Sequence, residues 1–244
     1  MNDIRGDSSV PPAVGTSLSW VRDGQRRLEE TVAGLPADAV REPSALAGWT
    51  RGHVLTHLAR NADALVNLLT WARTGRRTPM YSSPGQRNAD IEAGAGRALA
   101  EQQDDLRTSA RRFAEAAAAM SQDDWQALVT NAQGRDIPAA EVPWMRVREV
   151  WIHLVDLRVG AGMDVLPAEL AWTLVREVAG SMSAKVDVSV ELVAHGYGRV
   201  VLGPARPRGT AAGPPAALAA WLTGRDGVGS LDRSGELPEI PRWL

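Results

Sequence analysis

Cysteine is absent from the 244 residues of the chain. Its absence excludes disulfides, zinc fingers with cysteine ligands and a cysteine nucleophile, and it fits a reducing cytoplasm. Any thiol chemistry would therefore have to use a thiol that comes from outside the protein.

An excess of charge of either sign is also missing, because 27 Lys and Arg face 29 Asp and Glu and leave a net charge of -2. This balance favours neither nucleic acid nor an anionic membrane as a partner. No apolar run approaches the roughly 20 residues of a membrane span, and the N-terminal MNDIRGDSSVPPAVG has no apolar core of signal-peptide length. We expect a soluble cytoplasmic protein with small-molecule partners, and a monomer is the simplest expectation for its oligomeric state.

The most informative stretch is Trp144 to Asp156, WMRVREVWIHLVD, in which a carboxylate and an imidazole interrupt an apolar helical pattern. Glu149 and His153 are four residues apart and so share one helix face. Apolar residues surround them in nearly every direction, which indicates a helix enclosed by protein. A buried carboxylate beside a buried imidazole needs a direct hydrogen bond, an arginine partner such as Arg146 or Arg148, or a metal ion with a third ligand from elsewhere.

A second helix, Trp49 to Ala72, carries His53 and His57, again four residues apart on an apolar helical pattern. Thr50 is a good N-cap for this helix, and Gly75 is a good C-terminal stop. Three of the four histidines of the chain fall on these two helices, which favours a metal site.

The first part of the chain has the pattern of an up-down four-helix bundle, a fold in which facing side chains often hold metal ions. Its four long helices are expected at Ser17–Ala33, Trp49–Ala72, roughly Gln86–Met120 with a break at Gly94 and Gly96, and Trp144–Asp156. A short helix near 123–129 and a turn or tight hairpin around Gly134 precede the last of them.

After Gly160 the pattern is that of a small α+β domain, so the fold class is mainly α with a small α/β addition. A helix at 167–183, a hairpin turning at Gly196 or Gly198, a short helix at 214–223 and a loop-rich tail are expected in this order. ARPRGTAAGPP is a poor strand candidate because of Pro204 and Pro207. We predict a flexible tail at 1–15, a bundle at 16–163 and the small domain at 164–244.

The long loop from Arg77 to Glu92, with prolines at 79 and 84, is a natural position for binding residues between two helices. Tyr81 and Arg87 are its candidates. The alternative for Arg87 is an ordinary solvated arginine on the surface.

Several segments together resemble the mycothiol-dependent maleylpyruvate isomerases, which belong to the DinB-like superfamily of metal-binding four-helix bundles. The similar segments follow one another in the same order over nearly the whole chain: GWTRGHVLTHLARNA, TGRRTPMYSSPGQRN, AQGRDIPA, WMRVREVWIHLVDL, WLTGRDGV and the terminal PRWL. The resemblance implies a zinc ion held by His57, Glu149 and His153, mycothiol as the thiol cofactor and Arg225 as an essential residue of the active site. His53 is not a ligand by this resemblance.

The chemistry of such a site agrees with its expected use. Three protein ligands leave a tetrahedral zinc with one position for an external ligand, and zinc favours a thiol in its deprotonated form. The reaction that the resemblance implies is addition of the thiolate to the double bond of maleylpyruvate, rotation, and elimination to fumarylpyruvate. The charge that develops on the keto side and the substrate carboxylates need fixed cations, and Arg225 is the first choice and Arg87 the second.

Other interpretations of these residues stay open. Without the family resemblance, Arg225 in a glycine-flanked turn is more often an exposed solubilising residue. His53 fits helix packing, a contact to a ligand or a contact to substrate. Asp156 fits an acceptor for a ligand or an ion pair with Arg148 or Arg158. Most of the nine tryptophans belong to the core, although those at 49, 144 and 151 lie on site-bearing segments and fit a pocket lining.

Two other functions also fit the sequence. One is a mycothiol- or bacillithiol-dependent S-transferase that retains the thiol adduct as its product. The other is a non-enzymatic metal-binding bundle, which the arginines expected near the site disfavour.

Overall fold

The computed structural model describes residues 11–225 and 227–243. Its chain forms two compact units, one from Pro12 to Gly160 and one from Ala161 onward. The tail expected at 1–15 lies largely outside the described residues, and Val14 and Gly15 at its end already belong to the first helix. In the part of the chain that is described, no helix combines the length and the hydropathy needed to cross a membrane.

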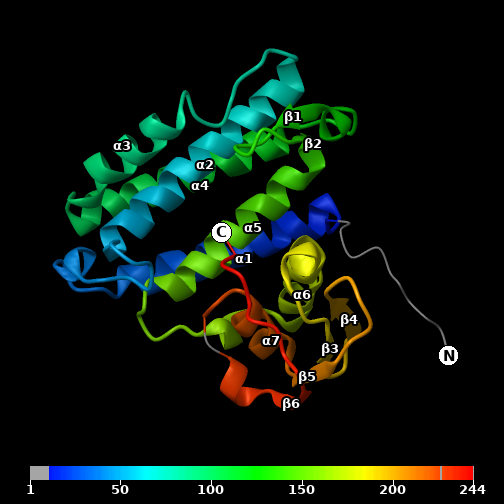
Figure 1. The fold of residues 1–244 in the computed structure, drawn as a ribbon. Helices are drawn as coiled ribbons and strands as arrows, with labels where there is room; N and C mark the ends of the chain where they lie inside the picture. Colours follow the sequence, from blue (N-terminus) through cyan, green and yellow to red (C-terminus); the bar gives the residue numbers. More distant parts are fainter. Residues whose placement is uncertain (1–10, 226, 244) are drawn as a thin grey trace. The chain divides into compact units, whose positions relative to one another are not determined.

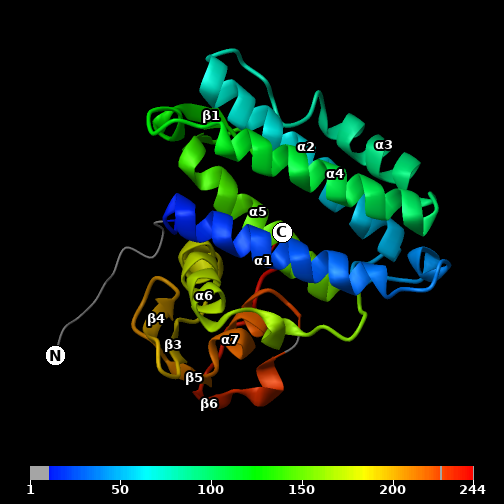
Figure 2. The same cartoon turned by 180° about the vertical axis from the view of Figure 1, so that it is seen from behind.

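The first unit is a four-helix bundle, as the apolar periodicity predicts (Figures 1 and 2). Its long helices are α1 (Val14–Ala33), α2 (Arg51–Thr74), α4 (Leu99–Ala118) and α5 (Val142–Asp156). Helix α2 packs against α4 and α5, and α1 packs against α5 and α4. Fully buried leucines at 28, 58, 65, 68 and 106 fill the space between them.

Helix α2 begins and ends at the residues that the sequence predicts. The Thr50 hydroxyl accepts from the His53 backbone N–H at 3.4 Å, and the His53 ring Nδ1 accepts from the Thr50 backbone N–H at 3.2 Å. Gly75 closes the helix with a φ of 69°, the left-handed conformation that glycine adopts without strain. These two ends fix the register in which His57 enters the bundle.

The helix expected over 86–120 is two helices, α3 (Pro84–Ala95) and α4, separated near the glycines where a break is predicted. A Cβ on Gly94 would lie 2.4 Å from Cγ2 of Thr56, so α3 approaches α2 closely only because this residue is glycine. The buried Gln102 amide of α4 donates to the carbonyls of Gly94 and Ala95, both at 3.0 Å. These bonds satisfy carbonyls that a helix end leaves without partners.

The short helix expected near 123–129 is reduced to a single 3-10 turn, which a hairpin follows. A 3-10 turn at Asp124–Gln126 leads into strand β1 (Leu128–Thr130), which pairs with β2 (Asp136–Pro138) around Gly134, whose φ is 77°. The hairpin around Gly134 is therefore confirmed, whereas the helix ends before Leu128. The strand is favoured because Val129 and Ile137 pair across the hairpin and are both buried.

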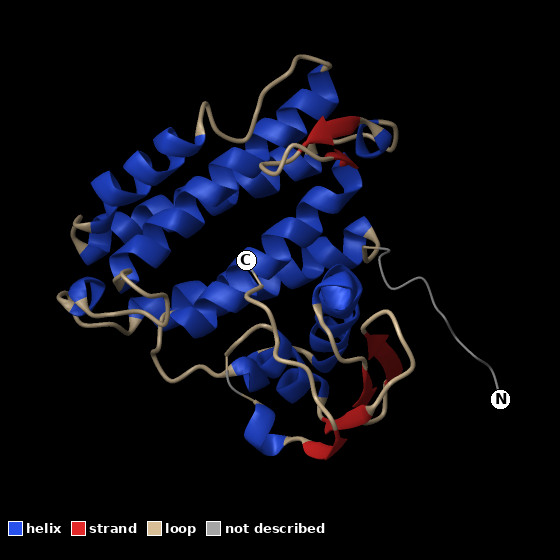
Figure 3. Ribbon diagram, viewed as in Figure 1, coloured by secondary structure: helices blue, strands red, loops and turns tan. Residues whose placement is uncertain are grey.

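The second unit contains α6 (Ala168–Met182), α7 (Pro215–Leu222) and a sheet of β3 (Val190–Ala194), β4 (Gly198–Leu202), β5 (Gly209–Gly213) and β6 (Asp232–Gly235) (Figure 3). The strand order is β4-β3-β5-β6, and β3 and β5 run parallel. The hairpin predicted at 196–198 is the β3–β4 connection.

Strand β5 corrects the expectation that its segment forms no strand. Pro204 and Pro207 precede the strand and remove no hydrogen bond from it. Its glycines are required because other segments of the protein pack closely against them. A Cβ on Gly209 would lie 2.3 Å from the Glu236 carbonyl oxygen, and one on Gly213 would lie 2.7 Å from Cδ2 of Leu231. The loop-rich tail expected after α7 likewise contains β6.

Candidate metal centre

Helix α5 is enclosed by protein on most sides, as its composition predicts. Val147, Val150, Trp151 and Leu154 are at most 2% exposed. The face of Glu149 and His153 is less tightly covered, since these side chains keep 24% and 16% of their surface exposed. A small molecule can therefore reach this face.

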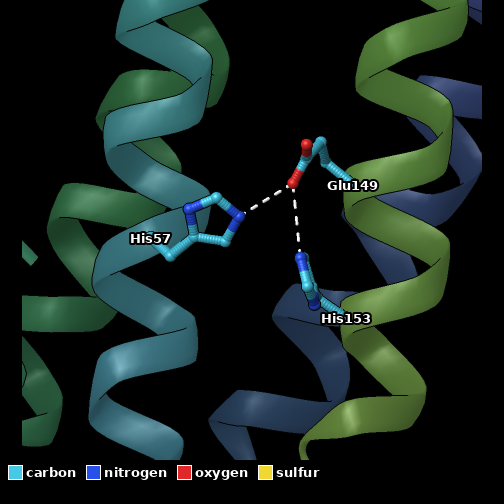
Figure 4. Close-up of side chains that lie close together, drawn as sticks. All are labelled: His57, Glu149 and His153. Atoms are coloured by element: carbon cyan, nitrogen blue, oxygen red, sulfur yellow. Dashed lines mark hydrogen bonds and ion pairs between the residues drawn. The ribbon is translucent and has the colours of Figure 1, made fainter. Parts of the chain in front are cut away.

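The structure brings His57 of α2 to Glu149 and His153 of α5 (Figure 4). One carboxylate oxygen, Oε2 of Glu149, lies 2.8 Å from Nε2 of His57 and 3.3 Å from Nε2 of His153. The three atoms that could bind a metal lie within 4.8 Å of one another, and the two imidazole rings meet edge to face at 4.9 Å. Two ring nitrogens and a carboxylate oxygen thus converge on one small volume.

The protonation states of the three groups differ although the groups are in contact. Burial lowers the pKa of His57 despite the attraction of Glu149. Burial alone would raise the pKa of Glu149, but His57 and His153 hold it well below its ordinary value. Burial disfavours charged His153 as well, yet hydrogen bonds to Asp156 and Glu149 raise its pKa to about 9. Without a metal, His153 is therefore cationic, Glu149 anionic and His57 neutral at neutral pH.

These residues fit a zinc ion by the nature and the arrangement of their donor atoms. Imidazole nitrogen and carboxylate oxygen are ordinary zinc ligands, and three protein ligands are the usual number at a catalytic site. Asp156, 1% exposed, binds Nδ1 of His153 at 2.8 Å and so directs Nε2 towards Glu149. A carboxylate on the distal nitrogen of a histidine is the common support for a metal ligand.

Tyr81, in the loop before α3, and Arg87, in α3 itself, lie beside this cluster, so the loop expected over 77–92 is shorter than predicted. Nη2 of Arg87 lies 3.4 Å from Nδ1 of His57, and its guanidinium lies 5.9 Å from the centre of the Tyr81 ring. Burial and the Glu149 charge raise the pKa of the Tyr81 hydroxyl, although Arg87 opposes the shift. The site therefore has a cation and a neutral phenol at its edge.

His53 has a different position from His57. Its ring completes the cap of α2, and its Nε2 lies 3.3 Å from a carboxylate oxygen of Glu92. Trp49 stacks on this ring at 6.1 Å and meets the His57 ring at 5.5 Å. The capping role of His53 was not foreseen, although the spacing Thr50-x-x-His53 is its signal in the sequence.

The other candidates separate into core residues and residues of the second unit. Trp144 packs on Trp20 of α1 at 6.1 Å, and Trp151 donates to the Trp20 carbonyl at 2.9 Å, so both belong to the α1–α5 contact. Arg225 follows α7, where its backbone N–H donates to Ala220 at 2.8 Å and its Nη1 donates to the Thr223 carbonyl at 2.6 Å.

Comparisons with known proteins agree with this architecture. A family model described as the mycothiol maleylpyruvate isomerase N-terminal domain matches residues 21–158. No curated protein sequence matches the chain significantly. A crystal structure of the mycothiol-dependent maleylpyruvate isomerase matches with a TM-score of 0.86, and one of its histidine-to-alanine mutant matches with 0.85. Each is 33% identical in sequence, with 96% of this chain and 98% of the other covered. Because the family model spans more than half of the chain and the solved structures nearly all of it, the chain belongs to the family of mycothiol-dependent maleylpyruvate isomerases.

Proposed function

We propose that the protein is a zinc- and mycothiol-dependent cis-trans isomerase that converts maleylpyruvate, or a similar unsaturated keto acid, to its trans isomer. The observation that carries the proposal is the convergence of His57, Glu149 and His153 within 4.8 Å in a member of this isomerase family. The chain contains no cysteine, so the reactive thiol must be a cofactor.

The three converging residues would hold the metal. His57 and His153 would each present Nε2, and Glu149 would present Oε2, the atoms that already face one another. Asp156 would keep the His153 ring in orientation through Nδ1. Zinc bound by these residues would keep a thiol deprotonated and nucleophilic near neutral pH.

Two arginines would handle the charge of the substrate. Addition of the mycothiol thiolate would form a C–S bond and turn the double bond of the substrate into a single bond, while the displaced electron pair moves towards the keto oxygen. After rotation, return of this pair would restore the double bond and expel the thiolate. A fixed cation at that oxygen stabilises the charge as it develops, and Arg225 is the first candidate for this role. Arg87, which lies 3.4 Å from His57, would bind a substrate carboxylate through its guanidinium.

The test is an assay of zinc-loaded protein with maleylpyruvate in the presence and in the absence of mycothiol. We expect the trans isomer to form only with mycothiol and the concentration of free thiol to stay constant. Full turnover without the thiol would contradict the proposal. Stoichiometric loss of thiol, with this substrate or with a generic electrophile, would identify an S-transferase instead, and a zinc-loaded protein inert in all assays would identify a binding bundle.

Variants of Arg225 test the second unit in the same assay. Arg225→Ala should keep stoichiometric zinc, because the three ligands belong to the first unit, and should lose turnover. Arg199→Ala is the matched control, since Arg199 lies in the same unit with 72% of its side chain exposed. Equal turnover of both variants would remove Arg225 from the site.

A further inference from the structure

Arg146 of α5 is a charged side chain that is completely buried in the bundle. It is 0% exposed. Its Nη1 donates to the Leu58 carbonyl at 2.8 Å and to the side-chain oxygen of Asn61 at 3.0 Å, and its Nη2 donates to the side-chain oxygen of Gln25 at 3.3 Å. All three acceptors are neutral, so hydrogen bonding satisfies the guanidinium but does not neutralise it.

Three groups act on the charge of Arg146 through space. Burial lowers its pKa to about 10, whereas Glu149, Asp63 and the Tyr81 hydroxyl favour the charged form. Asp63 already has two cations of its own, Arg60 at 2.9 Å and Arg112 at 2.5 Å. Glu149 lies three residues further along α5, where helical side chains are neighbours. Glu149 is therefore the main counter-charge of Arg146.

Hydrogen bonding alone does not explain why this buried residue is charged, because a neutral donor could bond the same three acceptors. Burial of an ion without a paired partner costs several kcal/mol, and apolar residues of similar volume often replace buried charges without loss of stability. The position of Arg146 behind a predicted metal ligand supplies such a reason.

Metal binding changes the charge balance around Arg146. The negative charges of the Glu149 and Asp156 carboxylates together balance the two positive charges of a divalent ion. With the ion bound, the negative charge of Glu149 no longer compensates Arg146. The charge of Arg146 is left in excess beside the site. Since His57 and His153 bind as neutral ligands, the next group to enter is favoured when it is an anion.

We propose that Arg146 is an electrostatic positioning residue, whose buried charge behind Glu149 makes the metal site select an anionic ligand, a thiolate rather than a thiol. The inference rests on the proposed function, because it assumes a metal held by His57, Glu149 and His153. Arg146 touches neither the metal nor the thiol. It acts through Glu149.

The test replaces zinc with Co²⁺ and uses mycothiol as the probe. A thiolate bound to Co²⁺ gives a charge-transfer absorption band, and its growth with pH reports the midpoint of thiol deprotonation at the metal. Arg146→Gln keeps a donor but removes the charge. A unit charge about 10 Å away shifts such a midpoint by about one pH unit at an effective dielectric constant of about 20, so we expect the midpoint to rise by this amount. The fraction of bound thiolate below the midpoint falls about tenfold.

Two further variants separate the charge from the hydrogen bonds. Arg146→Lys keeps the charge and should restore the wild-type midpoint. Arg111→Met removes an arginine of the same unit whose side chain is 69% exposed and pairs with the exposed Glu115, and it should leave the midpoint unchanged. If Arg146→Gln fails to fold, Arg146→Met combined with Gln25→Leu and Asn61→Leu removes the charge together with two of its acceptors.

The possible failures have different signatures. A wild-type protein that binds Co²⁺ but shows no charge-transfer band with mycothiol would contradict the proposed function. A wild-type band whose midpoint is unchanged in the folded neutral variants would overturn the role of Arg146 alone. A midpoint that rises equally in Arg146→Lys would also overturn it, because the effect would then come from packing.

Discussion

Replacement of Asp156 by asparagine tests the metal centre without touching a ligand. Asp156 is 1% exposed, and its Oδ2 lies 2.8 Å from Nδ1 of His153. Asparagine has the same shape and can still accept a hydrogen bond from this nitrogen, so His153 keeps its orientation. The substitution removes the negative charge behind the ligand.

The size of the effect follows from the strength of this bond. A hydrogen bond to a charged group contributes about 1.5 to 3 kcal/mol, and a neutral one contributes about 1 kcal/mol. The difference, about 1 to 2 kcal/mol, corresponds to about 5- to 30-fold weaker zinc binding. Loss of a group that supports a metal ligand typically weakens metal affinity by about 10- to 100-fold, which overlaps this range.

Competition with a chromogenic chelator at pH 7 measures the zinc affinity of Asp156→Asn. Asp124→Asn is the matched control, since the Asp124 carboxylate accepts from the backbone N–H of Ser121 and contacts none of the three proposed ligands. Thermal unfolding of both metal-free proteins shows whether the fold is kept. Equal zinc affinity of a folded Asp156→Asn variant and the wild type would refute the reasoning, because His153 would then not depend on the carboxylate.

Three further predictions concern the ligands, the pH dependence and the packing of the bundle. His57→Ala should lose stoichiometric zinc in elemental analysis, whereas His53→Ala, one turn earlier, should keep it; zinc retained by both would remove His57 from the ligand set. The pKa of His153 is raised to about 9, so protonated His153 should stabilise the metal-free protein fully below about pH 6.5, and this stabilisation should be lost as the pH rises through 9. Urea unfolding at a series of pH values measures the free energy of unfolding, with a His153→Asn variant as the reference. Parallel pH profiles of this free energy in the two proteins would contradict the prediction. Gly24→Ala should destabilise by about 1 to 3 kcal/mol in urea unfolding, because its Cβ would lie 2.6 Å from the indole nitrogen of a buried α5 tryptophan. Gly15→Ala, with no atom within 4 Å of its Cβ, is the control on the same helix and should not destabilise.

Local patterns were sufficient for the helices and for part of the site. The spacing of Glu149 and His153 within an apolar run predicted both the burial of α5 and the face that the two side chains share, and helix geometry makes that inference independent of the rest of the chain. The ends of α2 were equally local, since Thr50 and Gly75 act on the backbone next to them. Single helices therefore followed from the sequence with their functional faces.

Contacts between segments did not follow in the same way. Nothing in the spacing of His53 and His57 decides which of them meets α5, and only the family resemblance favoured His57. Strand β5 was missed because its glycines look unlike a strand until the close approach of Glu236 and Leu231 is known. Both cases depend on a partner distant in sequence, which composition and periodicity do not contain.

Arg146 is a residue whose expected role changes once its contacts with distant segments are known. In the sequence it was one of two arginines that could compensate Glu149 by direct pairing, yet its guanidinium instead bonds Leu58, Asn61 and Gln25 from two other helices. A direct ion pair would consume the charge of Glu149 and weaken it as a metal ligand. Because neutral groups hold the arginine away from Glu149, the carboxylate oxygen stays between the two histidines, which keep its pKa low. The charge of Arg146 then remains available to favour an incoming anion.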